Sequence, residues 1–294
     1  MDTLSLRLFL RIADLGSVSA AAYDLSLSPA SASARLVKLE ATVGFRMFNR
    51  TTRAVSLTTD GEAFLPYAQQ TLEILETGLS AVKGQRAEAQ GLLRMTMPGS
   101  FGRMYIIPIL AEFQARHPAV SLDLRLSDEV LDVVEGAYDL IIRNASLVDS
   151  RLIVRQLAPD RRLLVASPAY LERYGMPSTP TDLTEHQCVI LAENNRWKFA
   201  NGQTISVPRS ISVNDGEAMR TLIEQGMGIG IKSLWNASAS LKSGRLVEVL
   251  SDFPLVTEVS IWLLYPSRRI VAPKVQAMID FLIEQFQPVP PWEC

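Results

Sequence analysis

The sequence predicts an α+β protein built from three parts: a small helical head, one long helix and a larger α/β body. Three observations predict this division. Apolar residues recur at helical spacing over residues 4–43 and again over residues 64–82. From residue 91 onward, strand-like and helix-like stretches alternate along the chain. The length of 294 residues also fits roughly two domains of about 150 residues each.

The composition excludes several classes of protein. Hydrophobic residues make up 48% of the chain and charged residues 20%, which argues against a disordered protein. The chain starts Met1-Asp2 without a basic stretch followed by an apolar one, and no apolar run approaches the ~18 residues of a membrane span. Its two cysteines, Cys188 and Cys294, do not make a disulfide framework. We therefore expect a cytoplasmic protein with no membrane partner.

The charge is distributed unevenly along the chain. The whole sequence carries a formal net charge of −2. Residues 1–58 hold seven basic against four acidic side chains, which leaves +3 on the head and −5 on the remainder. A small basic head on a larger acidic body is typical of a protein that contacts nucleic acid through the head, although a bias of three charges also arises by chance.

The head begins with two short helices. Leucine and isoleucine side chains recur at helical spacing over residues 4–15, and Gly16 ends that helix. Ser17 can cap the next helix, whose three consecutive alanines at positions 20–22 allow another helix to approach closely.

The third helix carries the features of a recognition helix. Ser28 can cap its first turn, Pro29 suits the first helical position, and Gly44 ends it. Its apolar stripe of Ala32, Leu36, Leu39 and Val43 should pack on the first two helices. Two short helices followed by a capped third helix form a helix-turn-helix, whose third helix enters the DNA major groove with its N-terminal residues nearest the bases. The residues expected to contact DNA are Ser28, Pro29, Ala30, Ser31, Ser33, Ala34, Arg35 and Lys38. A plain surface helix could carry the same small residues.

A short hairpin, or wing, follows this helix. Val55 and Leu57 alternate with polar residues, as in a strand. The wing residues expected to reach phosphates or the minor groove are Arg50, Thr51, Thr52 and Arg53. A solvated loop is the alternative interpretation.

These residues together resemble the start of the LysR-type transcriptional regulators. The matching stretches are Phe9 to Ala22, Leu27-Ser28-Pro29-Ala30-Ser31-Ala32-Ser33, then Leu36, Leu39-Glu40, Gly44, and Phe48 with Arg50-Thr51-Thr52-Arg53. The family often has an arginine directly after the serine that matches Ser33, whereas this chain has Ala34. Arg35 follows and should project toward the side of the helix. The chain therefore has no arginine at position 34 that could read guanine.

The second helical repeat predicts a long helix between head and body. Thr59-Asp60-Gly61-Glu62 fits a capping box at its start. Its apolar seam consists of Phe64, Ala68, Leu72, Leu75, Leu79 and Val82. The resemblance implies that this helix is a dimer linker; packing against its own chain is the alternative. We expect a winged helix-turn-helix DNA-binding domain over residues 1–59 and a linker over residues 60–90.

The body over residues 91–294 reads as an α/β fold with mostly parallel strands. The expected strands cover residues 93–97, 120–126, 139–143, 163–166, 187–191, 204–207, 228–231 and 259–265. The expected helices cover residues 106–113, 129–135, 215–225 and 271–286. The resemblance implies a two-lobed effector-binding domain similar to type 2 periplasmic binding proteins. Its crossings would lie near residues 161–166 and 263–269, with lobe I at 91–163 and 266–294 and lobe II at 164–265.

In such two-lobed folds a ligand lies between the lobes, at strand ends and helix N-termini that favour anions. The resemblance implies the effector-binding residues Ser100, Phe101, Ser127, Arg143, Asn144, Trp197, Asn214 and Asp215. Each of them could instead be an ordinary turn residue. Arg143 is suited to pairing with a carboxylate, so a small carboxylate is the favoured effector class.

The sequence does not point to an enzyme. His117 and His186 lack other ligands at metal-binding spacing, so no metal site and no cofactor is expected. No Gly-x-Ser-x-Gly motif occurs. The segment Gly226-Met227-Gly228-Ile229-Gly230 follows a predicted helix and lacks the third glycine of a dinucleotide site, so we interpret it as a helix-to-strand turn.

The resemblance therefore implies a sequence-specific, effector-responsive transcriptional regulator. It would bind inverted repeats in double-stranded promoter DNA as a homodimer or homotetramer, with RNA polymerase as a further candidate partner. Two alternatives stay open: a non-enzymatic solute-binding protein, and an architectural DNA-binding protein with weak sequence preference.

Overall fold

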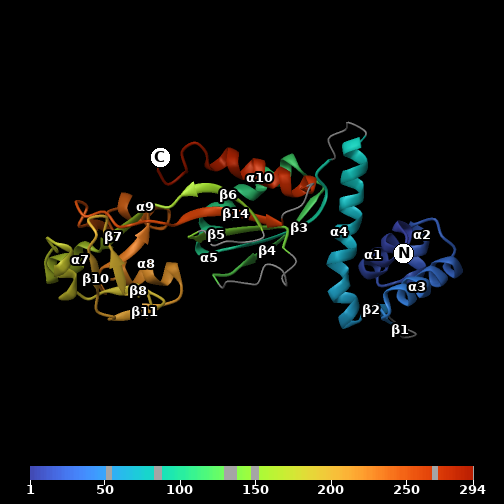
Figure 1. Cartoon of the computed structure of the whole chain (residues 1–294), viewed down its shortest axis with the longest axis horizontal. Coiled ribbons are helices and arrows are strands. Elements are labelled where there is room, and N and C mark those ends of the chain that lie inside the picture. The colour runs from blue at the N-terminus through green and yellow to red at the C-terminus, as the bar shows by residue number, and fades with distance from the viewer. Residues whose placement is uncertain (51–54, 83–87, 129–137, 147–151, 267–270, 294) are drawn as a thin grey trace. The chain divides into compact units, whose positions relative to one another are not determined.

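The computed structural model describes residues 1–50, 55–82, 88–128, 138–146, 152–266 and 271–293 (Figure 1). The chain divides into two compact units. The first unit comprises Met1–Glu88 with Arg269–Pro273, and the second comprises Ala89–Arg268 with Lys274–Cys294. Each unit has a hydrophobic core of its own.

The first unit opens with three helices whose ends follow the sequence signals. They are α1 (Thr3–Leu15), α2 (Val18–Asp24) and α3 (Pro29–Val43). The hydroxyl of Ser17 accepts a hydrogen bond from the Ala20 amide, and the hydroxyl of Ser28 accepts one from the Ser31 amide, each at 3.2 Å. Gly16 ends α1 in a left-handed backbone conformation with φ of 61°. The expected helices and their caps are confirmed.

The head core is formed by the apolar faces of these helices. Ala32, Leu36 and Leu39 of α3 are at most 2% exposed and pack with Phe9 and Ile12 of α1. Three of the four residues of the expected stripe are therefore buried and Val43 is half-buried, while the opposite face of α3 remains at the surface. Two short antiparallel strands, β1 (Phe48–Arg50) and β2 (Val55–Leu57), complete the head.

Helix α4 spans Thr59–Val82 and is capped one residue earlier than expected. The hydroxyl of Thr58, not Thr59, accepts the Gly61 amide at 2.9 Å, so the expected capping box from Thr59 to Glu62 is wrong. The physical reason is that β2 ends at Leu57, which places Thr58 at the helix start. There its hydroxyl also donates to the carbonyl oxygen of Arg46 at 2.7 Å.

The apolar seam of α4 divides into two halves. Ala68 and Leu72 are 1% and 7% exposed and belong to the head core. Leu75 and Leu79 are 42% and 53% exposed. The first half of the seam thus packs on its own chain, whereas the second half carries apolar side chains that the described part of the chain leaves in solvent.

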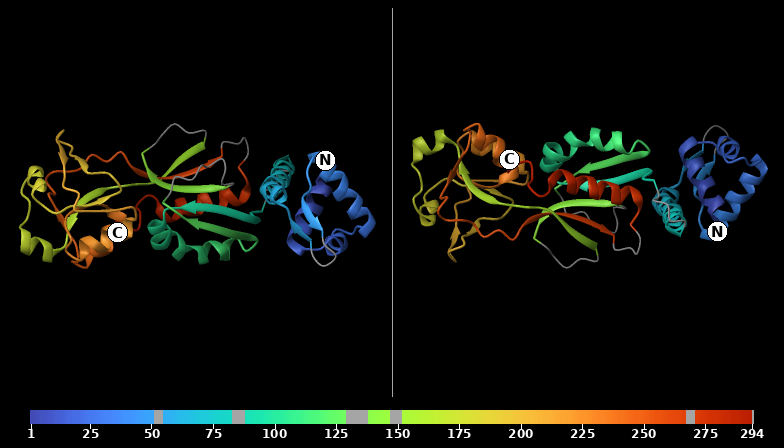
Figure 2. Two further views of the ribbon diagram at one scale, coloured as in Figure 1. Left: turned by 90° about the horizontal axis from the view of Figure 1, so that it is seen from below. Right: turned by 90° about the horizontal axis from the view of Figure 1, so that it is seen from above.

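The first lobe of the second unit is built on a five-stranded sheet with the order β4-β3-β5-β14-β6 (Figure 1). Its strands are β3 (Gly91–Met97), β4 (Val120–Leu126), β5 (Leu140–Ala145), β6 (Leu152–Pro159) and β14 (Ser260–Pro266). After β3 come α5 (Gly99–Phe101), a π-helical turn η1 (Gly102–Ile106), a 3-10 turn η2 (Ile107–Ile109) and α6 (Leu110–Arg116). Helix α10 (Pro273–Phe286) lies beside α6, as the ring contact of Phe113 with Phe281 shows (Figure 2).

The second lobe holds a three-stranded sheet and two strand pairs. The sheet has the order β12-β7-β13, and the pairs are β8 with β11 and β9 with β10. The strands are β7 (Arg162–Ala166), β8 (Val189–Leu191), β9 (Arg196–Lys198), β10 (Thr204–Ser206), β11 (Ile211–Val213), β12 (Gly230–Ser233) and β13 (Val247–Val249). The helices are α7 (Pro168–Tyr174), the 3-10 helix η3 (Pro180–Thr184), α8 (Gly216–Glu224) and α9 (Leu234–Lys242). The helix expected over residues 129–135 lies outside the described residues.

The two crossings between the lobes differ from the expectation. One connects β6 to β7 through residues 160–161, and the other connects β13 to β14 through residues 250–259. Strand β14 pairs with β5 and β6, so it belongs to the first lobe, not to a second lobe extending to residue 265. Likewise β7 lies wholly in the sheet of the second lobe. Alternation marked these strands, but only hydrogen-bonded pairing assigns a strand to a sheet.

Mostly parallel pairing is also wrong for the described strands. Strand β3 is parallel to β4 and β5, and β11 is parallel to β8. The pairs of β14 with β5 and β6, of β7 with β12 and β13, and of β9 with β10 are antiparallel. The cause in the first lobe is that β6 leads out of its sheet and β14 leads back, so these neighbours run in opposite directions.

Candidate functional site

The first candidate site is the exposed face of α3 at its N-terminal end. The residues at its surface are Ser28, Pro29, Ala30, Ser31, Ala34 and Lys38, while Ser33 is half-buried. The side chains in the first turns of α3 are all small, because residues 29–34 are proline, alanine and serine. The arrangement therefore presents a smooth, mildly polar helix surface that can approach another surface closely.

Two basic side chains of the head are held by carboxylates. The guanidinium of Arg11 lies 2.7 Å from the carboxylates of both Asp14 and Asp24. Its hydrogen bond lowers the pKa of Asp24. The guanidinium of Arg35 lies 3.0 Å from Asp2, beside the start of α1. Sequence reasoning counted both arginines toward the basic surface, but their charges are compensated within the head.

The wing is described only at its base. Phe48 pairs with Leu57 and Arg50 with Val55 across the two antiparallel strands. Thr51, Thr52 and Arg53 lie outside the described residues, as does the side chain of Arg50.

The second candidate site is a cavity of about 430 Å³ in the second unit. It lies between the ends of β3, β4 and β5 of the first lobe and the start of α8, strand β12 and the start of α9 of the second lobe. Six of the eight sequence-derived effector residues line it: Ser100, Ser127, Arg143, Asn144, Trp197 and Asn214. The cavity size suits a small metabolite.

Phe101 and Asp215 do not line this cavity. Phe101 is 1% exposed, and its ring packs 5.3 Å from Trp235 and 6.0 Å from Trp292, so it is a core residue. Asp215 is the N-cap of α8, and its carboxylate accepts the amides of Glu217 and Ala218 at 3.0 and 2.7 Å. Both residues lie near a strand end or helix start, as expected. However, the side chain of Phe101 is packed in the core, and that of Asp215 caps α8.

Sequence reasoning missed a cluster of lining residues at the end of β12, in the first turn of α9 and at the start of β7. They are Arg162, Lys232, Ser233, Trp235 and Asn236. The rule that ligands meet strand ends would have found four of them had it been applied to the strand expected at residues 228–231. Arg162 lies at the start of a strand, where that rule gives no signal.

The cavity has more positive than negative side chains. Arg143, Arg162 and Lys232 line it, against Asp128. Burial lowers the pKa of Arg143, whose guanidinium also donates to the carbonyl oxygen of Ile142 at 2.9 Å. Burial likewise lowers the pKa of Lys232 to about 8. Desolvation therefore acts on both cations, which favours an anion as their partner.

Several polar atoms around the cavity have no hydrogen-bond partner among the described residues. They are Ser100 Oγ, Asn144 Oδ1, Trp235 Nε1 and Asn236 Oδ1. Buried polar groups are nearly always satisfied in folded proteins, so such a cluster marks a place for water or ligand.

A buried carboxylate lies at the first crossing. Asp160 is 4% exposed, and burial raises its pKa. It accepts a hydrogen bond from Ser233 at 2.9 Å and lies 3.4 Å from the guanidinium of Arg162. These contacts link the crossing to both β7 and the end of β12, next to the cavity.

The described residues give no support for metal or thiol chemistry. Over the described ranges, no group of three or more histidine, cysteine or acidic side chains is arranged to hold a metal ion. Cys188 is buried, and this burial raises its pKa to about 12, so the thiolate is disfavoured. Gly226 to Gly230 forms the expected turn between α8 and β12, and a β-carbon on Gly228 would lie 2.5 Å from the carbonyl oxygen of Gln187. No helix in the described part of the chain is long and apolar enough to cross a membrane.

Two family models match the chain. The bacterial regulatory helix-turn-helix protein, lysR family, matches residues 4–62, and the LysR substrate binding domain matches residues 86–287. Together they span both candidate sites.

Relatives and solved structures agree with these matches. The chain is 33% identical to the probable HTH-type transcriptional regulator LtrA of Klebsiella pneumoniae, over 95% of this chain and 93% of that protein. It is 32% identical to the HTH-type transcriptional regulator DmlR of Escherichia coli, over 96% and 93%. The structure of CrgA, a LysR-type transcriptional regulator from Neisseria meningitidis, matches with a TM-score of 0.62 and 27% identity, over 97% of this chain and 98% of that one. The chain therefore belongs to the LysR family of transcriptional regulators, with a helix-turn-helix domain followed by an effector-binding domain.

Proposed function

We propose that this regulator binds double-stranded DNA sequence-specifically by inserting the first turns of α3 into the major groove. The observation that carries the proposal is the division of α3 into two faces. Ala32, Leu36 and Leu39 are buried in the head, while Ala30 and Ala34 are exposed on the opposite side. A helix held in this way has its N-terminal residues free to meet base edges.

The residue types on this face favour a particular mode of recognition. Alanine methyl groups at positions 30 and 34 suit contact with thymine methyls, and the hydroxyls of Ser31 and Ser33 suit bases or phosphates. Ser28 caps the helix and Pro29 begins it, so both would lie near the bases, and Lys38 would contact the phosphate backbone. Arg35 is paired with Asp2, so its contact with DNA would require breaking that ion pair.

The wing would supply the remaining contacts. Arg50, Thr51, Thr52 and Arg53 have the side chains that phosphates and a narrow minor groove attract. Because α3 has no arginine at position 34, these wing residues would provide a larger share of the binding free energy.

Two copies of the chain would associate through α4. Ile74, Leu75 and Leu79 expose between 42% and 53% of their surface in the described chain. Such a row of apolar side chains on one helix is stabilised by a matching helix of a second copy. The resulting dimer, or a tetramer of two such dimers, would bind inverted repeats.

A small-molecule effector would occupy the cavity of the second unit. The unsatisfied polar atoms and the excess of cationic side chains support a small carboxylate. Ser127, Asn144, Trp197 and Asn214 would contact it, and Arg143 lies at the same cavity. We assign DNA binding to residues 1–59, subunit pairing to residues 60–90 and effector binding to the remainder.

Replacing Ala34 by aspartate tests the role of α3. A carboxylate there would face DNA phosphates and base edges, so the affinity for a fragment centred on a mapped genomic binding site should fall at least 100-fold in fluorescence anisotropy. Ala41→Asp is the matched control, because Ala41 is also exposed on α3 but lies near its C-terminal end. Equal affinities of the two variants would contradict the proposal.

The same titrations separate the alternatives. A solute-binding protein would show no salt-dependent affinity for DNA. An architectural protein would bind mapped and scrambled fragments equally, with steep salt dependence. Thermal stabilisation by small organic acids tests the effector cavity independently of DNA.

A further inference from the structure

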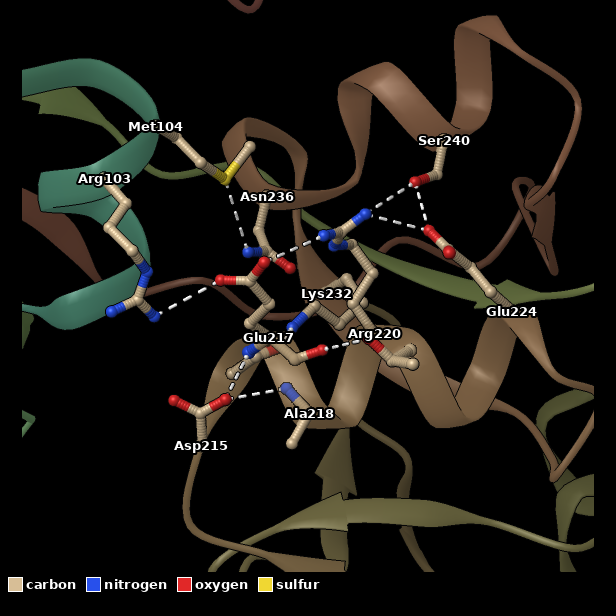
Figure 3. Close-up of polar contacts among 12 residues, drawn as sticks. Arg103, Met104, Asp215, Glu217, Ala218, Arg220, Glu224, Lys232, Asn236 and Ser240 are labelled. Carbon is tan, nitrogen blue, oxygen red and sulfur yellow. Dashed lines mark hydrogen bonds and ion pairs between the residues drawn. The ribbon is translucent and has the colours of Figure 1, made fainter. Parts of the chain in front are cut away.

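Lys232 is a buried cation without a paired anion. Its side chain is 5% exposed, and its ammonium donates to the carbonyl oxygen of Gly216 (Figure 3). Among the described residues, no carboxylate lies within the 4.0 Å of an ion pair with it. Burying an uncompensated charge is energetically costly, so this position favours a bound anion beside the ammonium.

The other charges near Lys232 do not neutralise it. Arg220 and Arg162 repel the ammonium, while Asp215 and Asp160 attract it from a distance. Arg220 is itself held by Glu217 at 3.4 Å and by Glu224 at 2.9 Å (Figure 3). Asp160 accepts a hydrogen bond from Ser233 and pairs with Arg162. None of these carboxylates is paired with the ammonium of Lys232.

A second buried polar group, the hydroxyl of Ser100, approaches the same end of α8 from the other lobe. A β-carbon on Gly216 would lie 3.7 Å from Lys232 Nζ and 3.8 Å from Ser100 Oγ, so both atoms converge on the first residue of α8. Ser100 is 3% exposed, and its hydroxyl has no hydrogen-bond partner among the described residues. Ser100 belongs to α5 of the first lobe and Lys232 to β12 of the second.

The amides at the start of α8 contribute little to binding an anion beside Lys232. Two amides of the first turn of α8, those of Glu217 and Ala218, already donate to the Asp215 carboxylate. An anion at this place would therefore be held mainly by the ammonium of Lys232 and the hydroxyl of Ser100.

We propose that Lys232 is the residue that selects a negatively charged effector, with its ammonium and the Ser100 hydroxyl binding one carboxylate group of that effector. This inference rests on the proposed effector-binding function and names the residue that recognises the charge. Since Ser100 and Lys232 come from different lobes, one carboxylate would join them.

The test compares Lys232→Met with Lys198→Met. Methionine removes the charge of Lys232 and keeps an unbranched side chain in the buried position. Lys198 is an exposed lysine on β9 of the same lobe and serves as the control. Circular dichroism and binding of the mapped DNA fragment establish that both variants are folded.

The probes are C2–C6 mono-, di- and hydroxycarboxylates, the corresponding primary amides, and inorganic phosphate and sulfate. Thermal shift of the full-length protein identifies the carboxylates that bind, and calorimetry measures their dissociation constants. We expect at least one carboxylate to bind, its amide to bind at least tenfold more weakly, and Lys232→Met to lose at least tenfold in affinity while Lys198→Met loses none. Phosphate or sulfate binding more tightly than every carboxylate would overturn the carboxylate assignment.

The pH dependence adds a readout that a purely structural lysine would not change. Because the pKa of Lys232 is lowered to about 8 in the free protein, carboxylate affinity of the wild type should fall by up to tenfold per pH unit above that value. Lys232→Met should show no such fall. Equal affinity of Lys232→Met and wild type would overturn the assignment of Lys232 and leave the effector function standing. Failure of every probe to bind the wild type would overturn both.

Discussion

Replacing Lys232 by methionine should stabilise the ligand-free protein near neutral pH. An ordinary lysine has a pKa of 10.5, whereas the pKa of Lys232 is lowered to about 8, first by burial and next by Arg220. Arg162 acts in the same direction, while Asp215 and Asp160 oppose it. The difference corresponds to about 3 kcal/mol of destabilisation while the unfolded chain and the folded protein both carry the charge.

The sign of the pH dependence follows from these pKa values. Between pH 8 and 10.5 the unfolded chain binds more protons at this residue than the folded protein, so wild-type stability rises with pH. The advantage of Lys232→Met should therefore shrink from about 3 kcal/mol at pH 7 to about 1 kcal/mol at pH 10. A constant offset from the lost hydrogen bond to Gly216 does not alter this trend.

Urea denaturation of both proteins at a series of pH values measures the effect. Other groups that titrate above pH 8 are common to the two proteins, so only their difference in free energy of unfolding is used. Lys198→Met, at an exposed position, should differ from the wild type by an amount that does not change with pH. A difference for Lys232→Met that stays flat or grows with pH would refute the reasoning.

Three further predictions concern other parts of the chain. Phe101→Ala should lower the free energy of unfolding by about 3–5 kcal/mol in urea denaturation, because Phe101 is a core residue. Ser100→Ala should change it by less than about 1 kcal/mol. Similar values for the two variants would contradict the core position of Phe101. Leu75→Glu combined with Leu79→Glu should reduce the molecular mass in sedimentation equilibrium to that of one chain, and an unchanged mass would exclude α4 as the pairing surface. Arg53→Ala should weaken binding to mapped and scrambled DNA by the same factor and reduce the salt slope by about 1. Unchanged affinity in a gel-shift titration would remove Arg53 from the interface.

The head could be predicted from the sequence because its signals are local. The caps at Ser17 and Ser28 and the glycines at 16 and 44 each act within one helical turn, and the structure has helix ends at all four places. The apolar stripe of α3 likewise determines which face is buried. The ion pair of Arg35 with Asp2 joins residues from two helices, and no local pattern indicates it.

The body was predictable in its elements but not in its pairing. Alternation predicted the strand at residues 259–265, yet its place beside β5 and β6 depends on hydrogen bonds between distant segments. Lys232 shows the same limit for the site. In the strand Gly230–Ser233 a lysine reads as a solvated side chain, and only the fold of the second lobe turns it toward a cavity.

Equilibrium titration of the full-length protein with labelled DNA tests the role of α3 most directly. One fragment is centred on a mapped genomic binding site, and the other is a scrambled sequence of the same length, both at about 150 mM salt. We predict that the mapped fragment binds at least about 10³-fold more tightly, with two or four chains per fragment. Equal affinity for both fragments, or binding by a single chain, would contradict recognition of DNA by a pair of α3 helices.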